Sequence, residues 1–97
     1  MPAMAGIEVW TLSPWMRLDR AERRMRREVA QNGGAMVGVT ASDKRQLRRL
    51  KQLYWRLEAD PDLSVYPADH RSAGVAYLIV WPLGRPAIAW RGEPKTG

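Results

Sequence analysis

Six basic residues and one tryptophan between Lys44 and Arg56 have the types and spacing that indicate a binding chemistry. At 100° per residue, one side of residues 42–60 collects an apolar stripe of Leu47, Leu50, Leu53, Tyr54 and Leu57. The basic residues occupy the rest of the circumference, and they are Lys44, Arg45, Arg48, Arg49, Lys51 and Arg56. Trp55 falls between Lys51 and Arg48, outside the leucine stripe. An indole among cations favours a ligand that is anionic and flat, and nucleic acid is the commonest ligand of that kind.

A second basic face is predicted on an earlier helix, over residues 14–31. Its apolar face carries Trp15, Leu18, Met25 and Val29, and the opposite face carries Arg17, Arg20, Arg23, Arg24 and Arg27. Asp19–Arg23 and Glu22–Arg26 are spaced four residues apart in the order that stabilises a helix. If the two helices pack side by side, their outward faces merge into one cationic patch.

The charge of the chain is concentrated where these two helices are predicted. The net charge is +6. Residues 17–56 carry a local charge of +8, whereas the remaining segments together carry −2. Thirteen of the sixteen basic residues are arginine, which coding bias in a GC-rich genome produces without selection for binding. The location of the charge, rather than its amount, therefore favours an anionic partner.

We therefore predict a small non-enzymatic protein that binds DNA or RNA through an arginine-rich two-helix surface, without a cofactor or metal. Its predicted contact residues are Arg17, Arg20, Arg24, Arg27, Lys44, Arg45, Arg48, Lys51, Trp55 and Arg56. The cations would contact phosphates, and Trp55 would stack on an exposed base. Since no established recognition-helix motif is visible, we expect low sequence specificity. The alternative for Trp55 is burial against the first helix, or stacking with Arg48 alone.

The second hypothesis is a protein-interaction module, such as a small inhibitor or adaptor from a phage or mobile element, that docks on an acidic surface of a partner. An exposed sheet face or edge would support this hypothesis, with a homodimer as the other outcome. The exposed face would be apolar and would carry Trp10, Leu12, Tyr77, Ile79 and Trp81. A shift of one residue in strand phase would return these side chains to the core. Membrane-surface binding ranks third, because an interfacial helix would place Trp55 on its apolar side.

Catalytic and metal-binding patterns are weak. His70 is the single histidine and follows Asp69, but the only nearby nucleophile is Ser72. Glu58, Asp60, Asp62 and Asp69 have a spacing broken by Pro61, so we interpret them as solvated residues of turns and helix ends. Residues 33–38 precede a strand and lack the lysine and hydroxyl of a phosphate-binding loop.

Length and composition predict a single domain over residues 1–97, ordered over about residues 6–91, with a loose tail at residues 92–97. The chain has no cysteine, which excludes disulfides and thiolate metal sites and fits a cytoplasmic compartment. Residues 1–6 carry no basic residue ahead of an apolar run, so no signal peptide is expected. The longest apolar stretch, residues 75–83, contains Pro82 and is far short of the roughly 20 residues of a membrane-spanning helix.

The predicted elements are strands at residues 6–12, 35–40, 63–66, 75–81 and 87–91, with helices at 14–31 and 42–60. Thr40 or Ser42 is the predicted N-cap of the second helix, and Asn32-Gly33-Gly34 ends the first. We interpret residues 67–74 as a loop and residues 82–85 as a turn. The order is β-α-β-α-β-β-β, which predicts an α+β fold with both helices on one face of a mixed or antiparallel sheet. A winged helix ranks second because it needs three helices.

Overall fold

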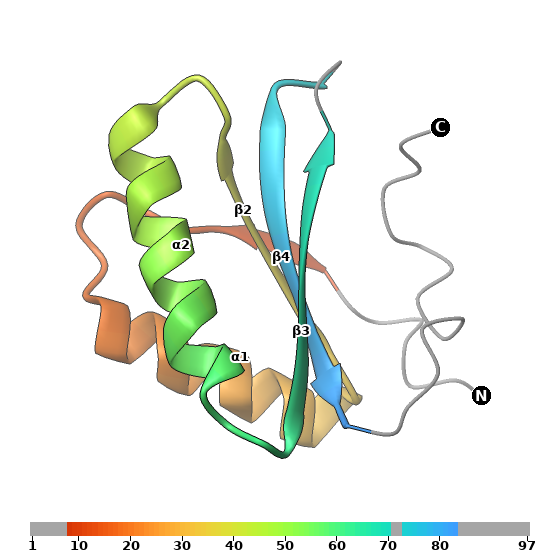
Figure 1. Ribbon diagram of the computed structural model, residues 1–97. Coiled ribbons are helices and arrows are strands. Elements are labelled where there is room, and N and C mark those ends of the chain that lie inside the picture. Colours follow the sequence, from red (N-terminus) through yellow and green to blue (C-terminus); the bar gives the residue numbers. More distant parts are fainter. Residues whose placement is uncertain (1–7, 71–72, 84–97) are drawn as a thin grey trace.

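Strands and helices alternate up to the third strand in the computed structural model, which describes residues 8–70 and 73–83. The order is β1 (Val9–Thr11), α1 (Leu18–Asn32), β2 (Ala35–Thr40), α2 (Lys44–Glu58), β3 (Leu63–His70) and β4 (Val75–Pro82) (Figure 1). The predicted hairpin strand at residues 87–91 and the predicted loose tail lie outside the described residues. The extent of the domain therefore stays a prediction.

The four strands form one mixed sheet in the order β1-β2-β4-β3. β1 and β2 are parallel, with Val9 opposite Met36, and α1 connects them. β4 is antiparallel to both β2 and β3, so it is an inner strand, as its β-branched and aromatic sequence predicts. Both helices lie on the same face of the sheet (Figure 1). The α+β prediction is therefore confirmed, and the winged-helix alternative is excluded.

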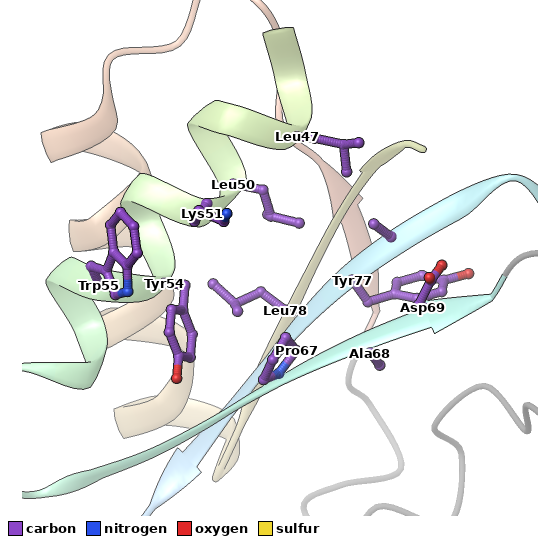
Figure 2. Close-up of a pocket in the computed structure, with 11 residues that line it drawn as sticks. Leu47, Leu50, Lys51, Tyr54, Trp55, Pro67, Ala68, Asp69, Tyr77 and Leu78 are labelled. Carbon is purple, nitrogen blue, oxygen red and sulfur yellow. The ribbon is translucent and has the colours of Figure 1, made fainter. Parts of the chain in front are cut away.

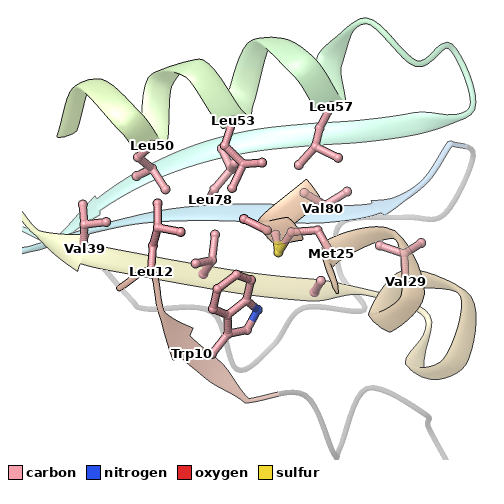
Figure 3. Packing of buried hydrophobic residues seen from close by; sticks show 13 residues of the cluster. Trp10, Leu12, Met25, Val29, Val39, Leu50, Leu53, Leu57, Leu78 and Val80 are labelled. Carbon is pink, nitrogen blue, oxygen red and sulfur yellow. The ribbon is translucent and has the colours of Figure 1, made fainter. Parts of the chain in front are cut away.

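The core lies between this sheet face and the two helices (Figure 3). α1 contributes Met25 and Val29, and α2 contributes the leucine stripe that its spacing predicts, with Leu53 and Leu57 fully buried. The strands contribute alternate residues, as the two-residue period of a strand requires. These strand residues are Trp10, Ala35, Val37, Val39, Leu78 and Val80.

Both helices begin later than predicted. Ser13 and Pro14 form a tight turn instead of the start of α1, because the Ser13 hydroxyl and carbonyl accept hydrogen bonds from the backbone amides of Trp15 and Met16. In α2 the N-cap is Asp43, whose carboxylate accepts bonds from the amides of Arg45 and Gln46. Gly33 ends α1 with φ of 83°, as predicted, since glycine adopts the left-handed conformation without strain.

The predicted phase of β1 is wrong. Trp10 is 8% exposed and belongs to the helix-covered core, as does Leu12, whereas Val9 is 45% exposed. The Arg24 guanidinium lies 4.2 Å from the Trp10 ring centroid and covers the outer side of the indole. At this edge strand, therefore, the large aromatic residue is buried and the smaller β-branched residue is exposed.

β3 is longer than predicted, because the strand continues through Pro67 to His70 instead of ending at Tyr66. Within the described residues β3 pairs only with β4, so it is an edge strand of the described sheet. Proline is tolerated there because its missing N–H is not needed by a further neighbour. The loop predicted over residues 67–74 is correspondingly shorter.

The sheet face opposite the helices carries a second cluster. Met36 and Ile79 are buried there, and Ala68, Tyr77 and Trp81 pack against them. Of the five residues predicted for an apolar second face, Tyr77, Ile79 and Trp81 lie on it. Trp10 and Leu12 do not, because of the phase error in β1.

The phase of β1 gives a direct test. Replacing Trp10 with alanine should lower the free energy of unfolding by about 3–5 kcal/mol, because the substitution removes a large buried ring. Val9→Ala on the same strand should cost less than about 1 kcal/mol. Urea unfolding followed by circular dichroism measures both values, and a larger loss for Val9→Ala would contradict the observed phase.

Candidate nucleic-acid interface

The basic face of α1 surrounds a shallow hollow of about 440 Å³. Its lining residues are Met16, Arg20, Arg23, Arg24 and Arg27. Arg24 is occupied, since its Nε lies 2.9 Å from a Glu28 carboxylate oxygen while the guanidinium covers Trp10. Arg20 and Arg27 are exposed and have no acidic partner among the described residues. Their charge is therefore available to a ligand.

Arg17, which the sequence places in the interface, lies in the extended residue before α1 and outside this hollow. Its Nε is 3.3 Å from Asp19, and Arg23 lies 3.8 Å from the other oxygen of that carboxylate. Burial opposes ionisation of Asp19, but hydrogen bonding and charge from Arg17 outweigh it and hold the pKa below its usual value. Arg17 therefore belongs to the predicted interface, but its charge is paired with Asp19.

The basic face of α2 borders a second hollow, of about 240 Å³, lined by Lys44, Leu47, Arg48 and Lys51. These three cations are exposed, as is Arg45, and none has an acidic partner in the described part of the chain. Trp55 is 58% exposed, and the Lys51 ammonium lies 5.8 Å from its ring centroid. Trp55 is thus not buried against α1, and its indole is available for stacking.

The junction between the helices is an ion network that includes Arg56. Arg26 binds Glu22 on its own helix at 2.9 Å and also binds the Asp60 carboxylate, which follows α2. Arg56 lies 3.5 Å from Glu22. The charge of Arg56 is therefore shared with an acid, and its role includes joining the helices. The hollows on α1 and α2 have no lining residue in common, so their merger into a single patch stays a prediction.

A clamp of buried and partly buried hydrogen bonds holds the connection between β1 and α1 against α2. The Gln46 amide donates to the Leu12 carbonyl, and the Arg49 guanidinium donates to the carbonyls of Ser13 and Met16. Arg49 also binds the Gln46 side-chain oxygen at 2.9 Å. These bonds supply donors to backbone carbonyl groups in the segment between β1 and α1. Arg49 is therefore a structural cation, in contrast to its neighbour Arg48.

Trp15 is an exposed aromatic residue, although its helical spacing predicted a place in the core. It is 86% exposed, in the turn that this clamp holds. The helical period pointed to the core only because α1 was expected to begin at Pro14. The Ser-Pro dipeptide before Trp15 is equally compatible with a turn, and the tertiary contacts of Arg49 select the turn.

The residues weighed for catalysis or metal binding form no cluster where they are described. No group of three or more histidine, cysteine, aspartate or glutamate residues is close enough to hold a metal ion among the described residues. The side chain of His70 and all of Ser72 lie outside the described part, so the Asp69–His70–Ser72 hypothesis has no geometry to test it.

The helix junction makes stability depend on pH in a defined direction. The Asp62 amide and then Arg26 donate hydrogen bonds to the Asp60 carboxylate and lower its pKa, while Asp60 raises the pKa of Arg26. A depressed carboxyl pKa stabilises the fold above the unfolded value, which is about 3.9, and this contribution disappears as the pH falls through the folded value.

Asp60→Asn should therefore unfold at a lower temperature than the unsubstituted protein at pH 7, because it keeps an acceptor for the Asp62 amide but loses the charge. The difference should shrink as the pH falls below about 4 and through the lowered pKa of Asp60, because protonation then leaves position 60 uncharged in the unsubstituted protein as it is in the variant. Thermal unfolding across a pH series measures this effect. Asp62→Asn is the control and should change little, and an effect of Asp60→Asn that does not depend on pH would contradict the ion-pair role.

Comparisons of the amino-acid sequence with known proteins assign no family to the chain. In the described part of the chain, neither helix has the length and apolar character needed to cross a membrane. No protein-family model and no curated protein sequence matches the chain.

Proposed function

We propose that this protein binds nucleic acid through the outer surface of its two helices. The observation that carries the proposal is the number of cations without an acidic partner. Six exposed basic side chains have none among the described residues, and they are Arg20, Arg27, Lys44, Arg45, Arg48 and Lys51. The described arginines with structural roles, such as Arg26 and Arg49, are instead held by acids or carbonyls.

Phosphate groups are the ligand that best fits these unpaired cations. Clustered like charges repel one another and lower the stability of the compact state. An anionic partner removes that repulsion, and a polyanion also releases counterions when it binds. Because the cations occupy two helices and project no recognised base-reading motif, binding depends mainly on charge and has low sequence specificity. The protein in this proposal has no enzymatic activity, and its lack of cysteine fits the cytoplasm.

An acidic surface of a partner protein is the second candidate, and the exposed Trp15 favours it. Tryptophan and arginine together are the residues most enriched in the energetic centres of protein interfaces. Trp15 lies two residues before Arg17, and the clamp holds the backbone on both sides of it through the carbonyls of Ser13 and Met16. In this case Trp15→Ala would abolish partner binding, and affinity for oligonucleotides would be negligible near physiological salt.

Charge reversal on both helices tests the first candidate. The double variant Arg27→Glu/Arg48→Glu should weaken binding to labelled oligonucleotides by at least about tenfold, since like charges would face the phosphates. The slope of log K against log salt should become shallower by about two, one for each lost phosphate contact. Fluorescence anisotropy over a salt series measures both quantities.

The matched control is Arg27→Lys/Arg48→Lys, which preserves both charges and should bind within about threefold of the unsubstituted protein. Circular dichroism should show that both double variants are folded, because neither arginine has a partner in the described structure. Equal binding by the glutamate variant and the unsubstituted protein would contradict the proposal.

A further inference from the structure

An apolar hollow opens between α2 and the two strands β3 and β4, beside the basic face of α2. Its volume is about 360 Å³, within the range of small-ligand sites. Leu50 and Leu78 lie toward the core, while Tyr54 and Trp55 come from α2 and Pro67 from β3 (Figure 2). The remaining lining residues are Leu47, Lys51, Ala68, Asp69, Ala76 and Tyr77.

This apolar hollow adjoins the smaller cationic hollow on α2. Leu47 and Lys51 line both of them. On one side of this shared boundary are aromatic and aliphatic side chains, and on the other are Lys44 and Arg48. A ligand that spans the boundary must combine a flat apolar group with a nearby negative charge.

A base and its adjoining phosphate have that combination. The base would lie in the apolar hollow against Trp55 and Tyr54, while the phosphate would lie beside Lys51, Lys44 and Arg48. The orientation with the phosphate at the cationic side is therefore electrostatically favoured.

A peptide strand is a poorer fit to the same place. A peptide that adds to a sheet edge needs a continuous row of backbone donors and acceptors on that edge. β3 is the edge beside the hollow, and Pro67 removes one donor from it. A base needs none of these backbone groups, since aromatic stacking is independent of them.

We propose that the apolar hollow receives an unpaired base of a single-stranded nucleic acid, with the neighbouring phosphate on Lys44, Arg48 and Lys51. This inference rests on the proposed function and makes it more specific. A base within a duplex is stacked and paired, so it cannot enter the hollow. The protein should therefore prefer single strands to duplexes of equal length.

The test compares a fluorescein-labelled 12-nucleotide poly(dT) strand, poly(rU) of the same length and a 12-base-pair duplex, by anisotropy near physiological salt. Trp55→Ala should weaken single-strand binding by about 5- to 150-fold, the effect of losing one stacked base. Trp55→Phe should restore most of the affinity, because it keeps an aromatic face. Duplex binding should change by less than about twofold in both variants.

Two further variants separate the hollow from the general surface. Trp15→Ala removes another exposed indole that does not line the hollow, and it should leave single-strand binding within about twofold. Ala76→Leu adds bulk inside the hollow without changing any charge or aromatic ring. It should weaken single-strand binding and leave duplex binding unchanged. If Ala76→Leu does not fold, the Trp55 and Trp15 variants still decide the question, since both positions are exposed.

The contrary results are distinct. If single strands and duplexes bind equally, and Trp55→Ala changes neither while Arg27→Glu/Arg48→Glu weakens both, the base site is wrong and the electrostatic function stands. If no oligonucleotide binds near physiological salt, both proposals fail. If a labelled polyglutamate peptide binds instead and depends on Trp55, the hollow belongs to an acidic protein partner, which also overturns the base site.

Discussion

The hydrogen bonds from Gln46 and Arg49 to the carbonyls after β1 determine how the helical layer is assembled. The chain must leave the sheet at Leu12 and turn before α1 can begin, which exposes carbonyl groups in a partly buried place. α2 supplies the donors from 33 to 36 residues further along the sequence. This contact fixes the rotation of α2 about its axis. It turns Gln46 and Arg49 inward, so that Lys44, Arg48 and Lys51 face solvent.

An ion network joins the two helices at their other end, and arginines are again the residues that form the structural contacts. Arg26 and Arg56 join α1 to the end of α2 through Glu22 and Asp60. Some arginines of α1 and α2 thus hold the helical layer together, while others leave their charge exposed to solvent. Arginine suits the structural task because its planar group donates several hydrogen bonds in fixed directions. Both lysines on α2 belong to the unpaired group.

The fold was largely predictable because the hydrophobic period identifies both helices, while short apolar and β-branched runs identify β2 and β4. The phase of β1 was not, since three residues of an edge strand alternate too briefly to show which side is buried. Arg24 decides it by covering Trp10, and this contact depends on how α1 crosses the sheet. Pro67 argued for a loop in the sequence, but sheet order makes β3 an edge strand where proline is permitted. Strand order depends on long-range packing, which the sequence pattern does not display.

The candidate site was predictable as a pair of helix faces, but not as a set of available charges. The spacing of Trp55 placed it outside the leucine stripe, and its exposure confirms that interpretation. Which cations lack partners depends on tertiary contacts: Arg24 stacks on a strand residue, and Arg56 bonds across to another helix. The hollow beside Trp55 could not be anticipated either, because its far wall comes from β3 and β4. Trp15 was assigned to the core because α1 was expected to begin at Pro14. In the structure α1 begins at Leu18, so the helical period does not apply to Trp15.

Because β4 is an inner strand near the end of the sheet-forming sequence, it bears on the order in which the sheet forms during synthesis on the ribosome. Amino acids join the chain in order, so β1, α1, β2 and α2 are synthesised before residues 75–82 exist. Until those residues emerge, the nascent β2 has β1 on one side and an open, strongly apolar edge on the other. The sheet is therefore completed late in synthesis, and until residues 75–82 exist the backbone groups on that edge of β2 lack their β4 partners.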